Sequence, residues 1–158
     1  MRRLSYIAVI TLGMFVLHAC GGADAPTEEA KDKTTQTAEA VVELDPKEQM
    51  FARGEKIYAD KCVVCHQANG EGILHAFPPL KDADYFLEDP IRAVEQVLNG
   101  SHEEMVVNGI TYNAPMPPQV DNHEDAVAVI NYALNSWGND GGWVTLEEVE
   151  HIEIGPRW

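Results

Sequence analysis

Apolar side chains recur at intervals of three and four residues in two long stretches of this chain, a spacing that predicts amphipathic helices. The first stretch covers residues 46–64 and follows Asp45-Pro46, a capping residue and a residue suited to the first helical turn. Glu48 at the third helical position extends this start signal. The second stretch covers residues 123–137, and Gly138 ends it. The pattern therefore predicts one long helix near each end of the folded part.

Two shorter helices follow from capping signals. Asp89-Pro90 repeats the capping signature ahead of residues 91–99, and Gly100 follows as a helix-ending residue. Thr145 and Glu148 form a capping-box pattern that predicts one weak helix near the C-terminus. The pattern thus predicts an all-α domain with three or four helices.

The chain also contains one hairpin signal and one long segment without regular periodicity. Asn108-Gly109 separates the β-rich triplets 105–107 and 110–112, which predicts a short hairpin with a type I′ turn. Much of the chain between Gln67 and Asp89 reads as loop. A loop of that length is unusual in a compact domain unless something else fills the core. A large apolar cofactor would be such a filler.

Gly54 lies inside the first predicted helix, where glycine is less favourable than alanine by about 1 kcal/mol. A packing reason is therefore expected. We predict that another helix crosses close to Gly54 and that Tyr58, one turn later, covers the contact.

The first 19 residues indicate an export signal rather than part of the fold. Arg2-Arg3 gives a positive start, and residues 4–17 form an apolar run that is short for a membrane span and typical of a signal peptide. The run leads to Leu17-His18-Ala19-Cys20, which resembles the bacterial lipobox, although His18 replaces the small residue usual there. We expect cleavage before Cys20 and lipidation of its thiol; the alternative is an ordinary secretory signal with Cys20 unmodified.

Residues 20–44 contain no aromatic side chain and cannot bury enough apolar surface to offset the entropy of ordering. We predict a disordered acidic tether there, between a lipid anchor and a domain at residues 45–138. Residues 139–158 form a C-terminal extension. The expected location is the bacterial cell envelope, with the protein lipid-anchored to a membrane and facing the periplasm.

The composition is strongly acidic. The whole chain has a formal charge of −15, and removing the leader with its two arginines leaves nine basic against 26 acidic side chains, a charge of −17. Such a surface excludes nucleic acid as a partner and favours a partner protein with a basic docking patch. The alternative is that the carboxylates serve solubility alone.

The stretch Cys62-Val63-Val64-Cys65-His66 carries the candidate chemistry. On a helix, residues three apart lie on one face, so both thiols point the same way. That arrangement suits addition to the two vinyl groups of haem, and the following histidine can then bind the iron. Cys-x-x-Cys-His is the attachment signal of c-type haem. Export supports this interpretation, because free dithiols oxidise outside the cytoplasm.

Three other uses of the two cysteines are less consistent with the sequence. A zinc site needs four ligands, and no further pair stands at ligand spacing. A thioredoxin-like dithiol needs a βαβ context, which this chain lacks. A disulfide between Cys62 and Cys65 would strain the helix.

The sixth iron ligand is expected to be Met116, because the prolines on both sides of it fix the backbone and hold the thioether in place. A thioether favours Fe(II) and raises the reduction potential. Met50 and Met105 are expected in the core. The next candidates for the sixth ligand are three histidines, His75, His102 and His123.

With these landmarks in order, residues 49–138 resemble a class I cytochrome c. The resemblance implies that fold, with three to four helices around haem and a minor β-hairpin. Gly54 and Tyr58 match the family's helix crossing, with Val129 and Tyr132 expected to receive them.

The resemblance extends to the loop before the second half of the domain. Pro78 or Pro79 resembles the proline whose carbonyl accepts the N–H of the axial histidine, and Pro78 is favoured. Several short stretches of the sequence are similar to cytochrome domains that accompany copper nitrite reductases and quinoprotein dehydrogenases. Tyr112, Asn113 or Trp137 is expected near the haem.

The resemblance implies a monohaem electron carrier of a respiratory chain, with one covalently attached haem c, redox proteins as partners and no small-molecule substrate. It implies no enzyme activity of its own. One alternative is a small haem peroxidase or gas sensor with a displaceable Met116. The other is a fixed subunit of a dehydrogenase, nitrite reductase or oxidase complex, with the tail from Asn139 as a docking element.

Overall fold

The computed structural model describes residues 44–157, a bundle of short helices with one two-stranded sheet, which confirms the expected fold class. The predictions of a leader, of a lipidated Cys20 and of a tether up to residue 43 lie outside the described residues. The elements in chain order are α1 (Pro46–Ile57), η1 (Tyr58–Cys62), α2 (Val63–His66), α3 (Asp84–Glu88), α4 (Pro90–Asn99), β1 (Met105–Val107), β2 (Ile110–Tyr112), α5 (His123–Leu134) and α6 (Leu146–Val149).

The first predicted helix begins as expected but does not continue as one regular helix. Asp45 and Glu48 form a complete capping box, and Pro46 occupies the first turn. At Tyr58 the backbone widens into a single π-helical turn, in which the N–H of Val63 reaches back to the carbonyl of Tyr58. The turn adds one residue before α2, so the sequence periodicity, which predicts a straight helix to residue 64, does not reveal it.

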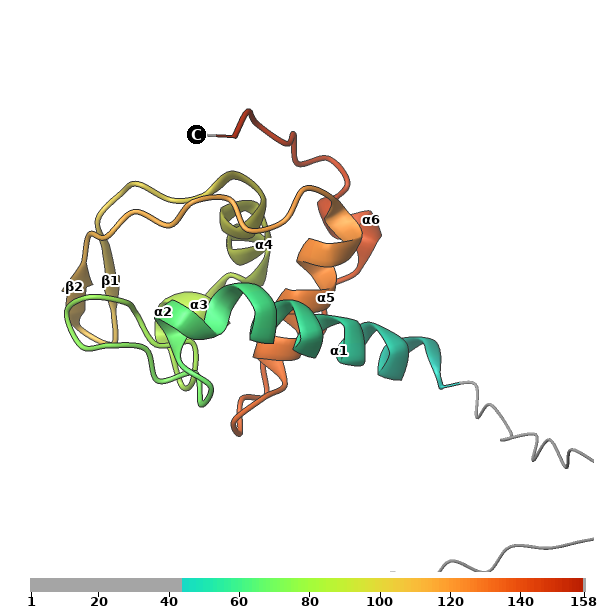
Figure 1. The fold of residues 1–158 in the computed structure, drawn as a ribbon, viewed down its shortest axis with the longest axis horizontal. Helices are drawn as coiled ribbons and strands as arrows, with labels where there is room; N and C mark the ends of the chain where they lie inside the picture. The colour runs from blue at the N-terminus through green and yellow to red at the C-terminus, as the bar shows by residue number, and fades with distance from the viewer. Residues whose placement is uncertain (1–43, 158) are drawn as a thin grey trace, which may run out of the picture. The chain divides into compact units, whose positions relative to one another are not determined.

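The helices α1 and α5 cross at Gly54 (Figure 1). A Cβ at Gly54 would lie 2.0 Å from the carbonyl oxygen of Ala128 and 2.8 Å from Cβ of Tyr132, so only glycine permits this approach. The ring of Tyr58 packs beside the contact, with its centroid 5.5 Å from that of Tyr132. The predicted crossing is therefore present, with one correction: Ala128 rather than Val129 meets Gly54, because Val129 lies on the side of α5 that lines a cavity.

The hairpin has the predicted register and turn. Val107 pairs with Ile110, and both residues of the Asn108-Gly109 turn have positive φ, as a type I′ turn requires. The segment before the hairpin, for which the sequence predicts loop, contains α3. The cap of α3 comes from the hairpin: the N–H of Asp84 donates to Oδ1 of Asn108 at 3.0 Å. A partner so far along the chain leaves no local start signal.

The final long helix is shorter than its apolar stripe. α5 begins after the cap Asn122 but ends at Leu134, not at Trp137. Trp137 takes a positive φ of 56°, which turns the chain away from the helix axis, and Gly138 follows at 94°. The indole still packs against Tyr58, with ring centroids 5.0 Å apart, so the hydrophobic periodicity reflects burial beyond the helix itself.

Residues 139–157 pack onto the domain. Val144 and Val149 are buried, and α6 contacts both α4 and α5. The buried side chain of Asn131 donates to the carbonyl of Val144 and accepts from its N–H, both at 2.8 Å. The predicted capping box of Thr145 and Glu148 is present.

Across residues 44–157, none of the helices has the length and apolarity needed to span a lipid bilayer.

Candidate functional site

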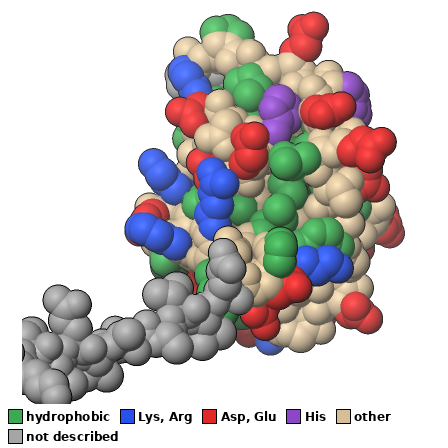
Figure 2. All heavy atoms as spheres, turned by 90° about the vertical axis from the view of Figure 1, so that its right-hand side faces the viewer, with side chains coloured by type: hydrophobic (Ala, Val, Ile, Leu, Met, Phe, Trp, Pro, Cys, Tyr) green, Lys and Arg blue, Asp and Glu red, His purple; other side chains and the backbone are tan. Residues whose placement is uncertain are grey.

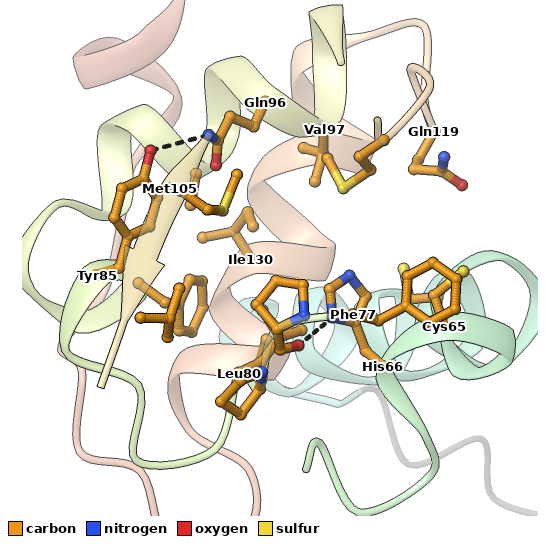
Figure 3. Close-up of a pocket in the computed structure, with 18 of the residues that line it drawn as sticks. Cys65, His66, Phe77, Leu80, Tyr85, Gln96, Val97, Met105, Gln119 and Ile130 are labelled. Atoms are coloured by element: carbon orange, nitrogen blue, oxygen red, sulfur yellow. Dashed lines mark hydrogen bonds between the residues drawn. The ribbon is translucent and has the colours of Figure 1, made fainter. Parts of the chain in front are cut away.

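A cavity of about 330 Å³ lies between α2, α4, α5 and the hairpin (Figure 3). Its walls are mostly apolar, with aliphatic and aromatic side chains from every one of these elements. Cys62, Cys65 and His66 reach it from one side of the domain, and Met116 reaches it from the loop after the hairpin. The structure therefore brings all four residues of the predicted haem site to one space.

The two cysteines face the cavity from consecutive turns. Cys62 belongs to the π-helical turn and is buried, whereas Cys65 lies on α2 and is partly exposed; both are free thiols. Burial and the neighbouring Cys65 raise the pKa of the Cys62 thiol to about 11. Before haem is attached, this shift favours the neutral thiol of Cys62 over the thiolate.

The imidazole of His66 is fixed by one hydrogen bond. Its Nδ1 lies 3.0 Å from the carbonyl oxygen of Pro78 (dashed in Figure 3), so the structure pairs it with Pro78 rather than Pro79. A carbonyl can only accept, so Nδ1 carries the proton and Nε2 keeps a free lone pair. Burial lowers the pKa of His66, which favours this neutral form. The arrangement presents a neutral nitrogen ligand to the cavity.

The loop that carries Pro78 is shaped by two glycines with positive φ. At Gly72, an added Cβ would lie 2.4 Å from the carbonyl oxygen of Phe77 and 2.6 Å from that of Pro78. At Gly70, it would lie 2.4 Å from the ring of Trp137. Only glycine permits these close approaches, which allow the loop to bring the Pro78 carbonyl to the ring of His66.

Met116 is held by backbone bonds on a segment without regular structure. Its N–H donates to the carbonyl of Ser101 and its carbonyl accepts from the N–H of Ser101, both at 2.8 Å. This isolated bridge joins the loop after the hairpin to the end of α4. The bridge adds to the restraint that the flanking prolines supply, and no pattern in the sequence indicates it.

Arg92 has an unusual electrostatic position in the cavity wall. Its guanidinium stacks on the ring of Tyr85 at 3.7 Å and donates to the carbonyl of Tyr85. Among the described residues, its Nε is the one buried side-chain nitrogen or oxygen with no hydrogen-bond partner. Nearby, Nε2 of Gln96 donates to the hydroxyl of Tyr85 at 3.1 Å (Figure 3). Sequence analysis missed Arg92, although a basic residue on the apolar face of a helix in so acidic a chain was a usable signal.

The remaining expectations are resolved residue by residue. Tyr112 lines the cavity, but Asn113 and Trp137 do not, and the indole of Trp137 donates to the carbonyl of Ala68 at 3.0 Å instead. Met50 packs against the core as predicted, while Met105 also faces the cavity. The histidines His75, His102 and His123 all lie outside its lining.

These residues fit an iron porphyrin. The cavity offers two thiols for thioether bonds, an imidazole with a fixed tautomer and a thioether, all within apolar walls. The unpartnered Nε of Arg92 matches a carboxylate such as a haem propionate, which would satisfy it. Among residues 44–157, no three His, Cys, Asp or Glu side chains are grouped so that they could hold a metal ion.

Comparison with known proteins supports the same interpretation. Residues 51–137 match the family model described as Cytochrome c. The chain is 37% identical over 93 residues to cytochrome c-552 of Thermus thermophilus, a match that covers 56% of this chain and 70% of that protein. For a second cytochrome c-552 of the same species the identity is also 37%, and the match covers 62% of that protein.

A more distant relative is the cytochrome c subunit of a quinone-dependent alcohol dehydrogenase from Gluconobacter oxydans. The chain is 26% identical to it over 109 residues, which are 63% of this chain but only 21% of that subunit. The likeness therefore concerns one cytochrome unit within a larger protein.

Proposed function

Since the chain belongs to the cytochrome c family and carries a covalently attached c-type haem, we propose that it is a membrane-tethered monohaem carrier, which passes single electrons between redox partners of a respiratory chain. The observation that carries this proposal is the convergence of Cys62, Cys65, His66 and Met116 on one cavity. When bound, haem supplies a one-electron couple between Fe(III) and Fe(II).

In this proposal the four residues have separate tasks. Cys62 and Cys65 would hold the haem by thioether bonds, and His66 and Met116 would bind its iron. His66 is already oriented by the Pro78 carbonyl, and Met116 is already positioned by its bridge to Ser101. Ligands that are fixed before electron transfer need little rearrangement during it, and with both side chains bound the iron would have no open position for a substrate.

The cavity walls and Arg92 adjust the environment of the group. Apolar walls exclude water, which raises the electrostatic effect of each nearby charge. The guanidinium of Arg92 lies 3.7 Å from the carboxylate of Asp89, and its buried, unpartnered Nε would let it also compensate part of the negative charge of a propionate. Both effects favour the reduced state and add to that of the Met116 thioether.

The first test uses protein from a host that attaches haem. Pigment that stays with the chain on acid–acetone extraction supports thioether attachment, and colourless protein contradicts the whole proposal. The variant Met116→Ala should bind CO in the reduced form. Its reduction potential should also fall, by a sizeable part of the roughly 0.8 V range over which axial ligands set that potential. Wild-type protein that binds CO equally well would instead favour a peroxidase or gas sensor.

The membrane tether is tested separately. We expect the N-terminal peptide of the mature protein to begin at Cys20 and to carry acyl chains, because more than one chain gives stable anchoring. Mass spectrometry of that peptide, and release of Cys20→Ser protein from membranes, measure this directly. A mature N-terminus elsewhere would contradict the anchor and leave the electron-carrier proposal unchanged.

The partner is proposed to be a redox protein with a basic docking patch. The chain carries 26 acidic against 11 basic side chains, and Figure 2 shows acidic side chains spread over one face of the molecule, with apolar side chains and several Lys and Arg side chains between them. Opposite charges speed the encounter of two proteins, and salt screens that effect. The electron-transfer rate to a basic partner should therefore fall from low to moderate ionic strength, and a flat response would contradict charge-guided docking.

A second candidate is a fixed subunit of an oxidoreductase complex. The likeness to the cytochrome c subunit of an alcohol dehydrogenase favours it. The haem chemistry would be the same in both cases. Co-purification of a catalytic subunit from gently solubilised membranes distinguishes the subunit from the free carrier.

A further inference from the structure

We propose that residues 139–157, the C-terminal extension, position the Met116 ligand by holding together the two chain segments that carry it. This inference rests on the proposed role of Met116 as axial ligand. The two segments are the end of α4 with Ser101, here called the α4 end, and residues 116–120, here called the methionine loop.

The two segments are joined to each other by a small set of backbone bonds. The bridge between Ser101 and Met116 is the first link. The N–H groups of Gln119 and Val120 both donate to the carbonyl of Val97, at 2.8 and 3.3 Å. Outside these bonds the methionine loop has no regular structure, so its position depends on where the α4 end lies.

The extension is firmly seated before it reaches these segments. Val149 of α6 is fully buried, and the amide of Asn131 pairs with both backbone groups of Val144. Because this part is fixed to α4 and α5, residues 150–157, here called the arm, can act as a rigid support.

The arm bonds to both segments. At the α4 end, the side chain of Asn99 donates to the carbonyl of Glu153 at 3.0 Å and accepts from the N–H of Gly155 at 2.7 Å. At the methionine loop, the guanidinium of Arg157 donates to the carbonyl of Val120.

A further contact fixes the start of the next helix. Nε2 of His123 donates to the carbonyl of Ile152 at 2.9 Å. The arm therefore contacts the chain before, within and after the stretch that holds Met116. The Cytochrome c family match ends at residue 137, so the arm lies outside the matched segment.

The test deletes residues 153–158 from the haem-loaded full-length protein, which leaves α6 and its buried valine in place. The measurement is the affinity of the ferric protein for imidazole, which must displace Met116 to bind the iron. The deletion removes the bonds of Asn99 with Glu153 and Gly155 and the bond of Arg157 with Val120. Their loss should shift the equilibrium between bound and displaced Met116 by roughly 5–30-fold, so imidazole should bind tighter by about that factor. Asn99→Ala should give a smaller increase of about fivefold, since it removes the bonds at one segment only.

Two matched variants separate positioning from stability. Asn99→Asp keeps the acceptor for Gly155 but loses the donor to Glu153, so it should fall between wild type and Asn99→Ala. Glu48→Ala breaks the capping box of α1, outside the extension, and should lower the unfolding temperature without changing imidazole affinity. Equal imidazole tightening in Glu48→Ala would show that general loosening, not positioning, is responsible and would overturn the inference.

The two proposals fail in different ways. The full-length ferric protein should show the long-wavelength charge-transfer band of a thioether-ligated haem, and its reduced form should show a strongly shifted methionine methyl resonance. Without those signals, Met116 is not a ligand and both proposals fall. With those signals, a deletion variant whose imidazole affinity stays within about twofold of wild type overturns only the role of the extension.

Discussion

On one side of this domain α1 crosses α5 at a glycine, and on the other side short segments surround a cavity. The crossing side is held by interlocking side chains: Gly54 fits against Ala128, and the ring of Phe51 lies 5.1 Å from that of Tyr132. The cavity side, made of α2, the loop 67–80, the hairpin and residues 113–118, is joined mainly by short backbone bridges of two hydrogen bonds each. Examples are the isolated bridges Ile73–Phe77 and Ser101–Met116.

The difference shows which parts of the fold the chain can hold by itself. Helices that bury apolar faces against each other need no other component. Short loops around an apolar cavity have no such support, and most of their contacts would be with the bound group. Haem is therefore part of the core on the cavity side, whereas the crossing side forms a core of protein alone.

Withholding haem should have the largest effect on this contrast. The double variant Cys62→Ala/Cys65→Ala cannot form thioether bonds and should carry no covalent pigment. Backbone amides of the cavity side should then lose protection against hydrogen exchange, while those of α1 and α5 stay protected by on the order of 100-fold more. Hydrogen-exchange mass spectrometry measures both sides in one experiment. Equal loss on both sides would show that the crossing side also depends on haem.

Gly54→Ala tests the crossing side directly. The added methyl would overlap the Ala128 carbonyl, and overpacking of this kind lowers the free energy of unfolding by about 3 kcal/mol. Denaturant unfolding of the haem-loaded protein measures the loss. The control Glu55→Ala, at the next and exposed position, should change stability by less than about 0.5 kcal/mol. A tolerated Gly54→Ala would contradict the close approach.

Asn131→Ala tests whether the extension belongs to the crossing side. It leaves the buried N–H and carbonyl of Val144 without partners, which should lower the free energy of unfolding by about 2 kcal/mol. The absorption spectrum of the bound haem should remain unchanged. Asn135→Ala is the control, because the side chain of Asn135 also makes two hydrogen bonds to the backbone, donating to the carbonyls of Asn131 and Gly142, but lies in a more exposed place. Equal losses in both variants would remove the special role of the buried amide.

The smallest expected effect is the contribution of Glu148 to the pH dependence of stability. Hydrogen bonds from the backbone and hydroxyl of Thr145 lower the pKa of this carboxyl below its ordinary value of 4.5. A lowered pKa stabilises the fold above that value, and the contribution is lost as the pH falls through the folded-state pKa. The unfolding temperature of Glu148→Gln should therefore differ from wild type at neutral pH and converge with it in acid. A constant difference at all pH values would contradict this origin.

The sequence predicted those elements whose start and stop signals are local. Asp45 and Asp89 cap their helices as expected, and Asn108-Gly109 makes the expected turn. The predictions failed where the decisive partner is distant. The cap of α3 comes from Asn108, and at the early end of α5 the carbonyls of Ala133 and Leu134 accept from the side chain of Asn139 and the N–H of Gly141.

The candidate site divides in the same way. The Cys-x-x-Cys-His motif and the proline-flanked Met116 are contiguous patterns that identify their own chemistry. The choice of Pro78 over Pro79, the bridge from Ser101 and the unpartnered Nε of Arg92 depend on how loops fold back on one another. No periodicity or spacing encodes those contacts, so they become visible only in the folded chain.

The π-helical turn at Tyr58–Cys62 has a consequence for protein engineering. One residue more per turn rotates everything after it by about 100° relative to a regular helix. Grafting the five-residue attachment motif onto a straight scaffold helix would thus aim the two sulfur atoms away from the porphyrin edge. A designer who wants to transplant haem attachment should carry the preceding wide turn along with the motif.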